Sequence, residues 1–297
     1  MKINKKPVFT GVGCALVTPF LNGEIDSLAF DALVEMQISA GTDALIIGGT
    51  TGEAATLSEK ERYTLYERAV KVIDGRCKVI LGTGTNDTQV AVKHTKFAAS
   101  LACDGALVVT PYYNKGTEEG IFRHYSMIAE SAGVPIILYN VPSRTGVNLG
   151  LNLLARLSEH ENIVGLKEAG DSTDRLVSLA AFGDTLPLYA GNDSQIYPVL
   201  ALGGKGVISV VSNIVPGAVK RITNSFFSGE SDISLKKQLE LLPFIKSLFI
   251  ETNPAPIKLA MASLGLIGPE LRLPLCEARE STRCTVLKEL SAISHLL

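Results

Sequence analysis

The chain is predicted to fold as an α/β protein, a TIM (β/α)8 barrel with a C-terminal helical extension. Short runs rich in Val, Ile and Leu alternate with longer helical patterns, most of them at a spacing of roughly 25 to 35 residues. Polar residues and glycines gather at the C-terminal ends of these runs, where barrel enzymes carry their active sites. A chain of 297 residues with 46% hydrophobic content can bury a core of the required size.

The predicted strands are short and almost continuously apolar, as expected for parallel strands that are buried on both faces. In chain order they are residues 13–18, 44–48, 79–82, 106–110, 136–139, 163–167, 188–190 and 207–211.

Helix start signals occur between the predicted strands. Ser58 followed by Glu61 resembles a capping box, and Asp87 and Thr117 are candidate N-caps. Beyond Val211 the strand signal stops, and helices are predicted around residues 216–227, 233–249, 256–264 and 277–296. We therefore divide the chain into a barrel, residues 1–215, and a helical extension packed on it, residues 216–297.

Composition excludes several classes of function. A net charge of -2 with mixed signs gives no basic face, so neither nucleic acid nor an anionic membrane is an expected partner. The five cysteines are scattered without CxxC or metal-type spacing, and no cofactor or metal is expected. The start of the chain lacks a long apolar stretch and no run approaches about 18 apolar residues, which predicts a cytoplasmic protein.

Lys167 is the strongest candidate for chemistry because it interrupts the apolar run at residues 163–169. Burial favours the neutral amine of a lysine, and a free amine can attack a carbonyl to form a Schiff base. The alternative is a strand-end lysine that snorkels to solvent or pairs with Glu168.

The segment Gly-Gly-Thr-Thr-Gly-Glu at residues 48–53 follows a predicted strand and precedes a helix. Its backbone amides can face an anion such as a carboxylate, while the absence of GxxxxGK[ST] and GxGxxG argues against a nucleotide phosphate. The alternative is a tight βα turn.

Two further candidates are Tyr139, which ends a predicted strand, and Arg144, on the loop that follows it. Tyr139 should lie beside Lys167, where its phenol can pass protons with Thr50 as a bridge, although a buried tyrosine bonded to the backbone is the common alternative. Arg144, on a loop pinned by Pro142, can hold a carboxylate or can simply be a surface arginine.

Tyr112 and Tyr113 follow another strand end, where one barrel cannot easily bury both rings. One of them can face a neighbouring subunit, or the pair can plug its own loop. The histidines His94, His124, His160 and His295 show no paired metal spacing and are read as structural. The glycine-rich residues 202–206 resemble the phosphate-site loop of some barrels, but a turn into the last strand is the commoner use of such a sequence.

Taken together, the motifs resemble the dihydrodipicolinate synthase family, within the pyruvate-dependent lyase superfamily that also contains N-acetylneuraminate lyase. The resemblance is collinear over almost the whole chain. It is carried by Gly-Thr-Thr-Gly-Glu at 49–53, Tyr-Tyr-Asn at 112–114, Tyr-Asn-Val-Pro-Ser-Arg-Thr-Gly at 139–146, Gly-Leu-Lys-Glu-Ala at 165–169 and Gly-Val-Ile-Ser-Val at 206–210.

The resemblance implies that Lys167 forms an imine with pyruvate, and that the resulting enamine adds to aspartate semialdehyde on the path to lysine and diaminopimelate. It implies a homotetramer built from tight dimers, although some members of the family stop at the dimer. The implied roles are a proton relay of Tyr139, Thr50 and Tyr113, with Tyr113 donated across the dimer interface, a pyruvate carboxylate held by the amides of Thr50 and Thr51, a semialdehyde carboxylate held by Arg144, and a lysine pocket lined by Gly191 and Ile208.

Two rival functions are an N-acetylneuraminate lyase and a silent relative that senses a keto acid. The first shares the lysine and tyrosine but is not expected to carry the sequence at 141–146 that contains Arg144. The second is disfavoured by the intact set of Lys167, Tyr139, Thr50 and Tyr113.

The family resemblance also implies a possible allosteric pocket near Asn86 and Tyr112, both present here. The other aligned positions depart from the lysine-inhibited pattern, and a valine replaces the glutamate that holds the ammonium group of lysine. A desolvated cation without a counter-charge is costly, so weak or absent inhibition by lysine is expected. The aligned positions are Ala54, Glu59, Arg62 and Val90.

Overall fold

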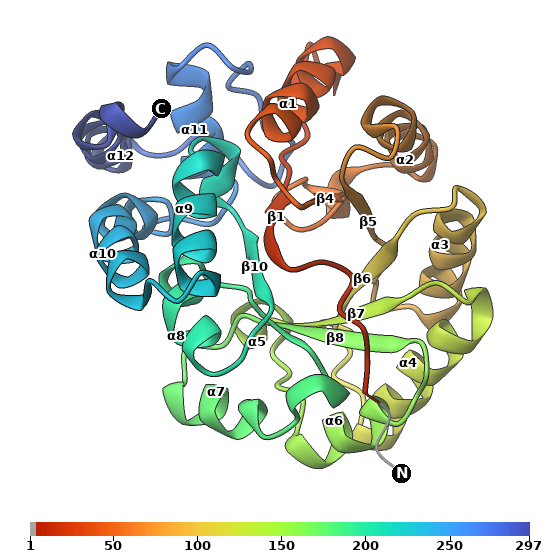
Figure 1. Cartoon of the computed structure of the whole chain (residues 1–297). Coiled ribbons are helices and arrows are strands. Elements are labelled where there is room, and N and C mark those ends of the chain that lie inside the picture. The colour runs from red at the N-terminus through yellow and green to blue at the C-terminus, as the bar shows by residue number, and fades with distance from the viewer. Residues whose placement is uncertain (1–3) are drawn as a thin grey trace.

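The computed structural model describes residues 4–297 and confirms the predicted fold: eight parallel strands close into a barrel that helices surround (Figure 1). Residues 1–3 of the predicted barrel segment lie outside the described residues. Neighbouring strands follow the order β1-β10-β9-β8-β7-β6-β5-β4, and β4 pairs with β1 to close the ring. The barrel strands are β1 (Gly11–Ala15), β4 (Ala44–Ile47), β5 (Lys78–Gly82), β6 (Gly105–Val109), β7 (Ile136–Asn140), β8 (Ile163–Glu168), β9 (Leu188–Ala190) and β10 (Gly206–Ser209).

The predicted strand positions are confirmed, with shifted ends. The first strand spans Gly11–Ala15 and not residues 13–18, and beyond its end the Thr18 hydroxyl donates to the Gly52 carbonyl at 2.7 Å. A small hairpin of β2 (Phe20–Leu21) and β3 (Glu24–Ile25) was not predicted, although its turn is the sequence Asn22-Gly23. Both turn residues have positive φ, 54° and 80°, the conformation that Asn-Gly hairpin turns require.

The predicted helix starts are also confirmed. Ser58 and Glu61 form a reciprocal capping box, and the side chains of Asp87 and Thr117 cap their helices. The helices are α1 (Ser27–Ser39), α2 (Glu59–Ile73), α3 (Thr88–Ser100), α4 (Glu118–Ala132), α5 (Pro142–Thr145), α6 (Leu151–Ser158), α7 (Thr173–Ala180), α8 (Ile196–Ala201), α9 (Pro216–Phe227), α10 (Ser231–Ser247), α11 (Ala255–Ser263) and α12 (Glu280–Ala292), with short 3-10 turns between some of them.

Alternation along the strands separates two cores. One set of side chains packs against the helices outside, and the other set fills the barrel interior. At the amino-terminal end of the strands, Phe9 stacks on Tyr189 with ring centroids 4.6 Å apart, and the Tyr189 hydroxyl donates to the Phe9 carbonyl at 2.8 Å. This packing fills the barrel interior at the amino-terminal end of the strands. Space for a cavity remains at their carboxyl ends.

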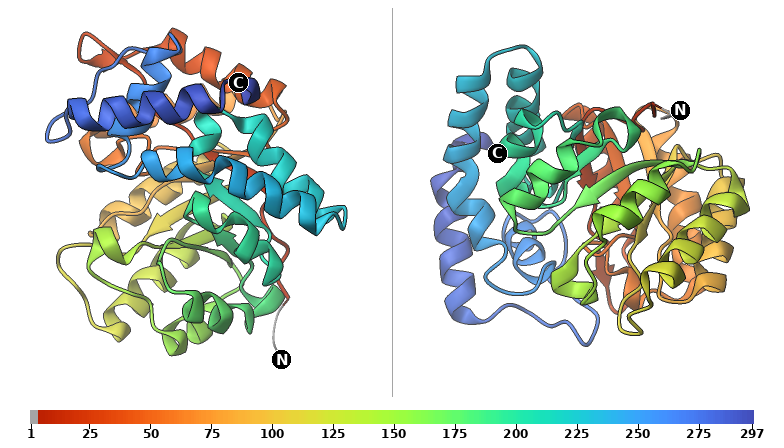
Figure 2. Two further views of the ribbon diagram at one scale, coloured as in Figure 1. Left: turned by 90° about the vertical axis from the view of Figure 1, so that its left-hand side faces the viewer. Right: turned by 90° about the horizontal axis from the view of Figure 1, so that it is seen from below.

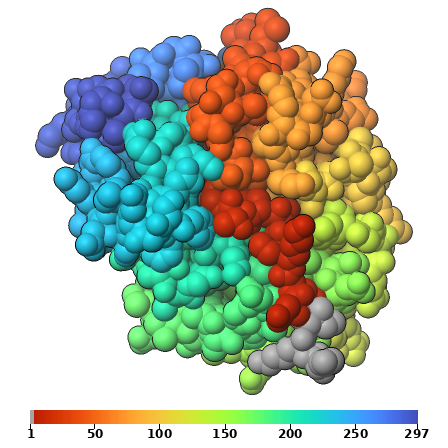
Figure 3. Space-filling view, viewed as in Figure 1, coloured from red at the N-terminus to blue at the C-terminus, as the bar shows by residue number. Residues whose placement is uncertain are grey.

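The C-terminal helices lie together on one side of the barrel (Figures 1 and 2). Helix α9 packs against both β1 and α10, so it joins the barrel to the helices that follow. In the space-filling view, residues from the end of the chain meet residues from its beginning on one continuous surface (Figure 3). No helix among residues 4–297 is both long and apolar enough to cross a membrane.

Candidate active site

A cavity of about 670 Å³ opens where the strands end. Loops after β4, β7, β8, β9 and β10 line it, together with the segment between α10 and α11. Its lining residues are Thr50, Thr51, Tyr139, Val141, Ser143, Arg144, Lys167, Ala169, Gly191, Asn192, Val210, Phe249, Ile250, Glu251, Thr252 and Asn253.

Lys167 is buried, with 5% of its surface exposed, yet it faces this cavity. The strand register places Tyr139 of β7 directly opposite Lys167 of β8, and the Lys167 ammonium lies 4.1 Å from the centroid of the Tyr139 ring. No carboxylate within residues 4–297 lies within ion-pair distance of it. A buried amine that faces a cavity without an ion-pair partner is placed to react with a carbonyl compound.

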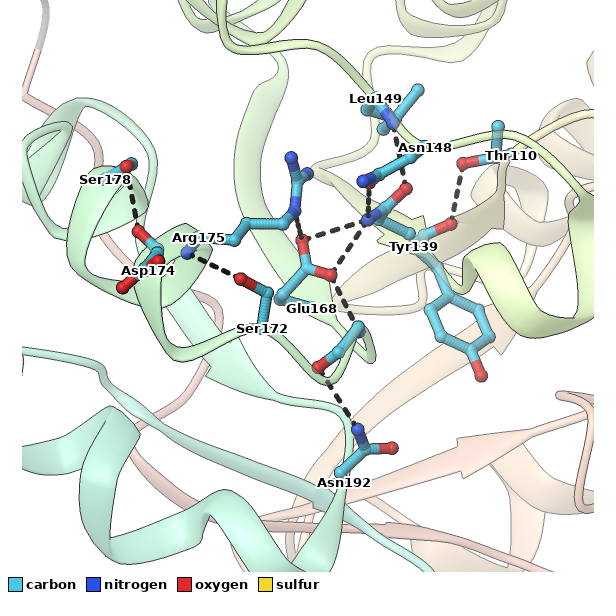
Figure 4. A network of polar contacts seen from close by, with 12 residues as sticks. Thr110, Tyr139, Asn148, Leu149, Glu168, Ser172, Asp174, Arg175, Ser178 and Asn192 are labelled. Carbon is cyan, nitrogen blue, oxygen red and sulfur yellow. Dashed lines mark hydrogen bonds and ion pairs between the residues drawn. The ribbon is translucent and has the colours of Figure 1, made fainter.

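Glu168 is the partner that a purely structural reading would give Lys167, but its carboxylate belongs to a polar network of its own (Figure 4). Its carboxylate accepts from the Asn140 side chain at 2.8 and 3.0 Å, from the Gly170 N–H at 2.8 Å and from Arg175 at 2.9 Å. Successive side chains of a strand point to opposite faces, so this network fixes the end of β8 without neutralising Lys167.

The segment at residues 48–53, here called the threonine loop, turns sharply after β4. Gly48 has a φ of 66°, and a Cβ there would meet the Tyr66 ring at 2.8 Å, so glycine is required. The N–H of Gly52 donates to the Gly49 carbonyl and that of Glu53 to the Thr50 carbonyl, both at 3.1 Å. Within the described residues, no hydrogen bond uses the N–H of Thr50 or Thr51, so both amides are available to an anion.

Arg144 enters the cavity wall from the short helix α5, which Pro142 starts. Its guanidinium donates to the Asn253 carbonyl at 2.8 Å, while the Asn253 side chain donates to the Thr51 hydroxyl at 2.9 Å. Asn253 therefore links Arg144 to the threonine loop across the cavity.

The other predicted site residues do not all meet here. Gly191 lines the cavity, but Ile208 is fully buried in the interior core and does not. Tyr113 lies outside the cavity of its own chain, 89% exposed and with a φ of 72°. Asn86 and Tyr112 are joined through Asn114, whose side chain donates to the Asn86 carbonyl at 3.0 Å and whose N–H donates to the Tyr112 carbonyl at 2.9 Å.

Two polar residues of the site were not predicted. Asn253 comes from the C-terminal region, and no local sequence signal connects it to the strand ends. Asp193 does carry a signal, because it follows the end of β9 by three residues. Its carboxylate is buried and accepts from the N–H groups of Val210 and Val211 at 2.9 and 3.0 Å. Burial raises the pKa of Asp193, and the hydrogen bond from Ser209 and the charge of Lys167 oppose that rise.

Among residues 4–297, no three His, Cys, Asp or Glu side chains are grouped so as to hold a metal ion. The site instead offers an amine, phenol and hydroxyl groups, free amides and a guanidinium, which suit a small anionic carbonyl compound.

Comparisons with known proteins agree with this chemistry. Residues 8–293 match the model of the dihydrodipicolinate synthetase family. A 4-hydroxy-tetrahydrodipicolinate synthase of Clostridium novyi is 46% identical over 92% of this chain and 93% of its own. The crystal structure of dihydrodipicolinate synthase from Thermotoga maritima superposes with a TM-score of 0.95 at 43% identity, covering 98% of this chain and all of that one.

A third relative was solved with a ligand. The dihydrodipicolinate synthase from Acinetobacter baumannii, complexed with pyruvate, has a TM-score of 0.94 and 38% identity, covering 97% of this chain and 100% of that one. On the family match and on relatives above 40% identity along nearly the whole length, this chain belongs to the dihydrodipicolinate synthetase family.

Proposed function

We propose that this protein is a 4-hydroxy-tetrahydrodipicolinate synthase, a lyase that condenses pyruvate with L-aspartate 4-semialdehyde through an imine on Lys167. The observation that carries the proposal is the placement of Lys167, which is buried, faces the cavity and lies against Tyr139 without a carboxylate partner. The pyruvate complex of the Acinetobacter baumannii relative supports the choice of keto acid.

The first step uses the threonine loop. The N–H groups of Thr50 and Thr51 hold the pyruvate carboxylate, which places the keto carbon near the Lys167 amine. The amine attacks that carbon, the keto oxygen leaves as water, and a protonated imine remains. Because the imine draws electrons from the pyruvate methyl group, loss of a methyl proton gives an enamine.

In the second step the enamine carbon attacks the aldehyde carbon of the semialdehyde, and the aldehyde oxygen takes up a proton as a hydroxyl. The amino group of the semialdehyde then attacks the imine carbon, closes the ring and releases Lys167. Overall, one pyruvate and one semialdehyde give one cyclic product and one water. Arg144 lines the cavity and supplies a guanidinium for the semialdehyde carboxylate.

Tyr139, Thr50 and Tyr113 form the proposed proton relay. The exposed ring of Tyr113 supports its donation to the site of a second copy, which requires a dimer, and we propose a tetramer built from two such dimers. Sedimentation analysis tests the assembly, and a monomer with full activity would contradict the shared relay. The proposed location is the cytoplasm.

The substrate assignment is tested by two assays run side by side. A coupled assay with pyruvate and aspartate semialdehyde should give turnover, and N-acetylneuraminate cleavage should not. Activity in the second assay alone would overturn the choice of substrate while leaving the imine chemistry in place.

We propose weak or absent inhibition by lysine. In the predicted pocket region, Glu59 is already paired with Lys93 at 2.6 Å, and Val90 offers no charge for an ammonium group. Inhibition assays up to millimolar lysine should leave the rate unchanged. A micromolar inhibition constant, or Val90→Glu failing to raise sensitivity to lysine, would contradict this account.

A further inference from the structure

Glu53 ends the threonine loop in an unusual state. It is a non-glycine residue with a φ of 53°, in the left-handed region. This conformation costs about 1 kcal/mol or more and persists only where surrounding contacts hold the residue in place. Its side chain has no exposed surface. Both carboxylate oxygens are used: one accepts from the Lys258 ammonium at 2.5 Å and the other from the Arg272 N–H at 3.0 Å.

Lys258 reaches Glu53 from helix α11, 205 residues further along the chain. Its side chain is also fully buried, lies 4.3 Å from the centroid of the Phe20 ring and donates to the Glu270 carbonyl at 2.8 Å. Burial lowers the pKa of Lys258, and the carboxylate of Glu53 opposes that change.

The same C-terminal region grips the loop at two further places. Asn253, just before α11, donates to the Thr51 hydroxyl at 2.9 Å. Arg272 donates to the Thr56 carbonyl at 3.1 Å and pairs with Glu61 in the first turn of α2. The segment from Thr51 to Glu61 is therefore clamped at both ends by residues 253–272.

Net stability is a poor explanation for the Glu53–Lys258 pair. Desolvation of two charges offsets most of their attraction, and apolar replacements of buried ion pairs are often neutral or stabilising. What such a pair provides is a fixed geometry. The Glu53 N–H donates to the Thr50 carbonyl, so fixing Glu53 fixes the plane of the peptide whose N–H is that of Thr51. The next N–H, that of Ala54, donates to the Gly49 carbonyl at 3.3 Å, which fixes the peptide whose N–H is that of Thr50. A misplacement of about 1 Å in a substrate-holding group can lower a rate about 10²-fold.

We propose that Glu53 and Lys258 are positioning residues for the pyruvate carboxylate: their ion pair sets the direction of the free Thr50 and Thr51 amides. The inference rests on the proposed function, in which these amides hold pyruvate. It assigns to the C-terminal helices a part in pyruvate binding, beyond packing on the barrel.

The test is the double variant Glu53→Gln/Lys258→Met, which removes both charges and keeps an acceptor for the Arg272 N–H. The matched control is Asp43→Asn/Lys220→Met, which removes an ion pair of 2.8 Å at the opposite end of the barrel. For each protein we would measure melting temperature, kcat, KM for both substrates, and the pyruvate concentration that half-saturates borohydride trapping of the imine.

The double variant should melt within a few degrees of the wild type and keep its KM for the semialdehyde within about twofold. Its KM for pyruvate and its half-saturating pyruvate concentration should rise about tenfold or more, with kcat at saturating pyruvate much less affected. The control should leave both pyruvate values unchanged.

An equally stable double variant with unchanged pyruvate values would overturn the inference. If the double variant does not fold, the isosteric Glu53→Gln decides by the same criterion. Failure of the wild type itself to form a reducible pyruvate adduct would instead refute the proposed function, and the positioning role with it.

Discussion

Two of the buried lysines among residues 4–297, Lys167 and Lys258, share an environment and differ in their partners. Lys167 and Lys258 both hold an ammonium group over an aromatic ring, at 4.1 Å from the centroid of Tyr139 and 4.3 Å from that of Phe20. Lys258 also has a carboxylate at 2.5 Å and a carbonyl at 2.8 Å, whereas Lys167 has neither within the described residues and faces a cavity. Burial alone therefore does not mark a reactive lysine.

The two lysines differ in what surrounds the amine: Lys258 has an ion-pair partner, and Lys167 faces a cavity. Around Lys258 the charged form is compensated, so the amine is held as a structural cation. Around Lys167 the cavity leaves room for a carbonyl compound, and reaction with it converts the amine to an imine.

Replacing the reactive lysine should give the largest effect on catalysis. Lys167→Ala removes the nucleophile, so kcat should fall by about 10³-fold or more and borohydride should trap no pyruvate adduct. Circular dichroism and thermal melting should show an intact fold, because no partner is left with an unpaired charge. A pyruvate adduct mapped by mass spectrometry to another lysine would refute the assignment.

Replacing Lys258 alone should have its largest effect on stability. Lys258→Met leaves the Glu53 carboxylate buried without its cation, so the free energy of unfolding should fall by about 3–5 kcal/mol. Urea unfolding measures this loss. Lys167→Met is the control and should change stability far less; equal losses in the two variants would remove the distinction between the lysines.

The aromatic neighbour of Lys167 can be tested without disturbing its packing. Tyr139→Phe keeps the ring but removes the phenol, so kcat should fall by about 10²-fold while KM for pyruvate changes little. Tyr125→Phe is the control, since Tyr125 is fully buried and its hydroxyl donates to Thr110 at 3.2 Å, outside the cavity. A normal kcat in Tyr139→Phe would exclude the phenol from the relay.

A pH dependence should reveal the ion pair between Glu61 and Arg272. Hydrogen bonds from Arg272 lower the pKa of Glu61 from 4.5 to about 2. A lowered acid pKa stabilises the folded state fully above pH 4.5, and this stabilisation is lost as the pH falls through about 2. At pH 7 the free energy of unfolding of Glu61→Gln should thus be about 1–3 kcal/mol lower than that of the wild type. Denaturant titrations should show that this difference becomes smaller towards pH 3. A constant difference at both pH values would be evidence against the ion pair.

Much of the barrel and the core of the site could be predicted from local sequence. The apolar strands, the capping box at Ser58 and the polar residues at strand ends are local signals, and closure of the barrel then brings Lys167 beside Tyr139. The resemblance to a family supplied the expected roles of Tyr113 and Arg144.

The contacts that residues 253–272 make with the segment from Thr51 to Glu61 could not be predicted in the same way. Lys258 stands alone in an apolar helix, the same kind of signal that singled out Lys167, but its partner lies 205 residues away. Sequence pattern carries no information on which distant carboxylate it meets. Ile208 illustrates the reverse case: it follows the strand pattern correctly, yet its side chain ends in the interior core and not in the cavity wall.

The long separation between Glu53 and Lys258 has a consequence for synthesis on the ribosome. At about 5–20 residues per second, roughly 10 to 40 seconds pass between translation of the carboxylate and translation of its cation. During this interval the nascent barrel cannot bury Glu53 at low cost. The threonine loop is therefore fixed only after α11 has emerged, so a nascent chain stalled before Lys258 should need more pyruvate for imine formation than the complete protein.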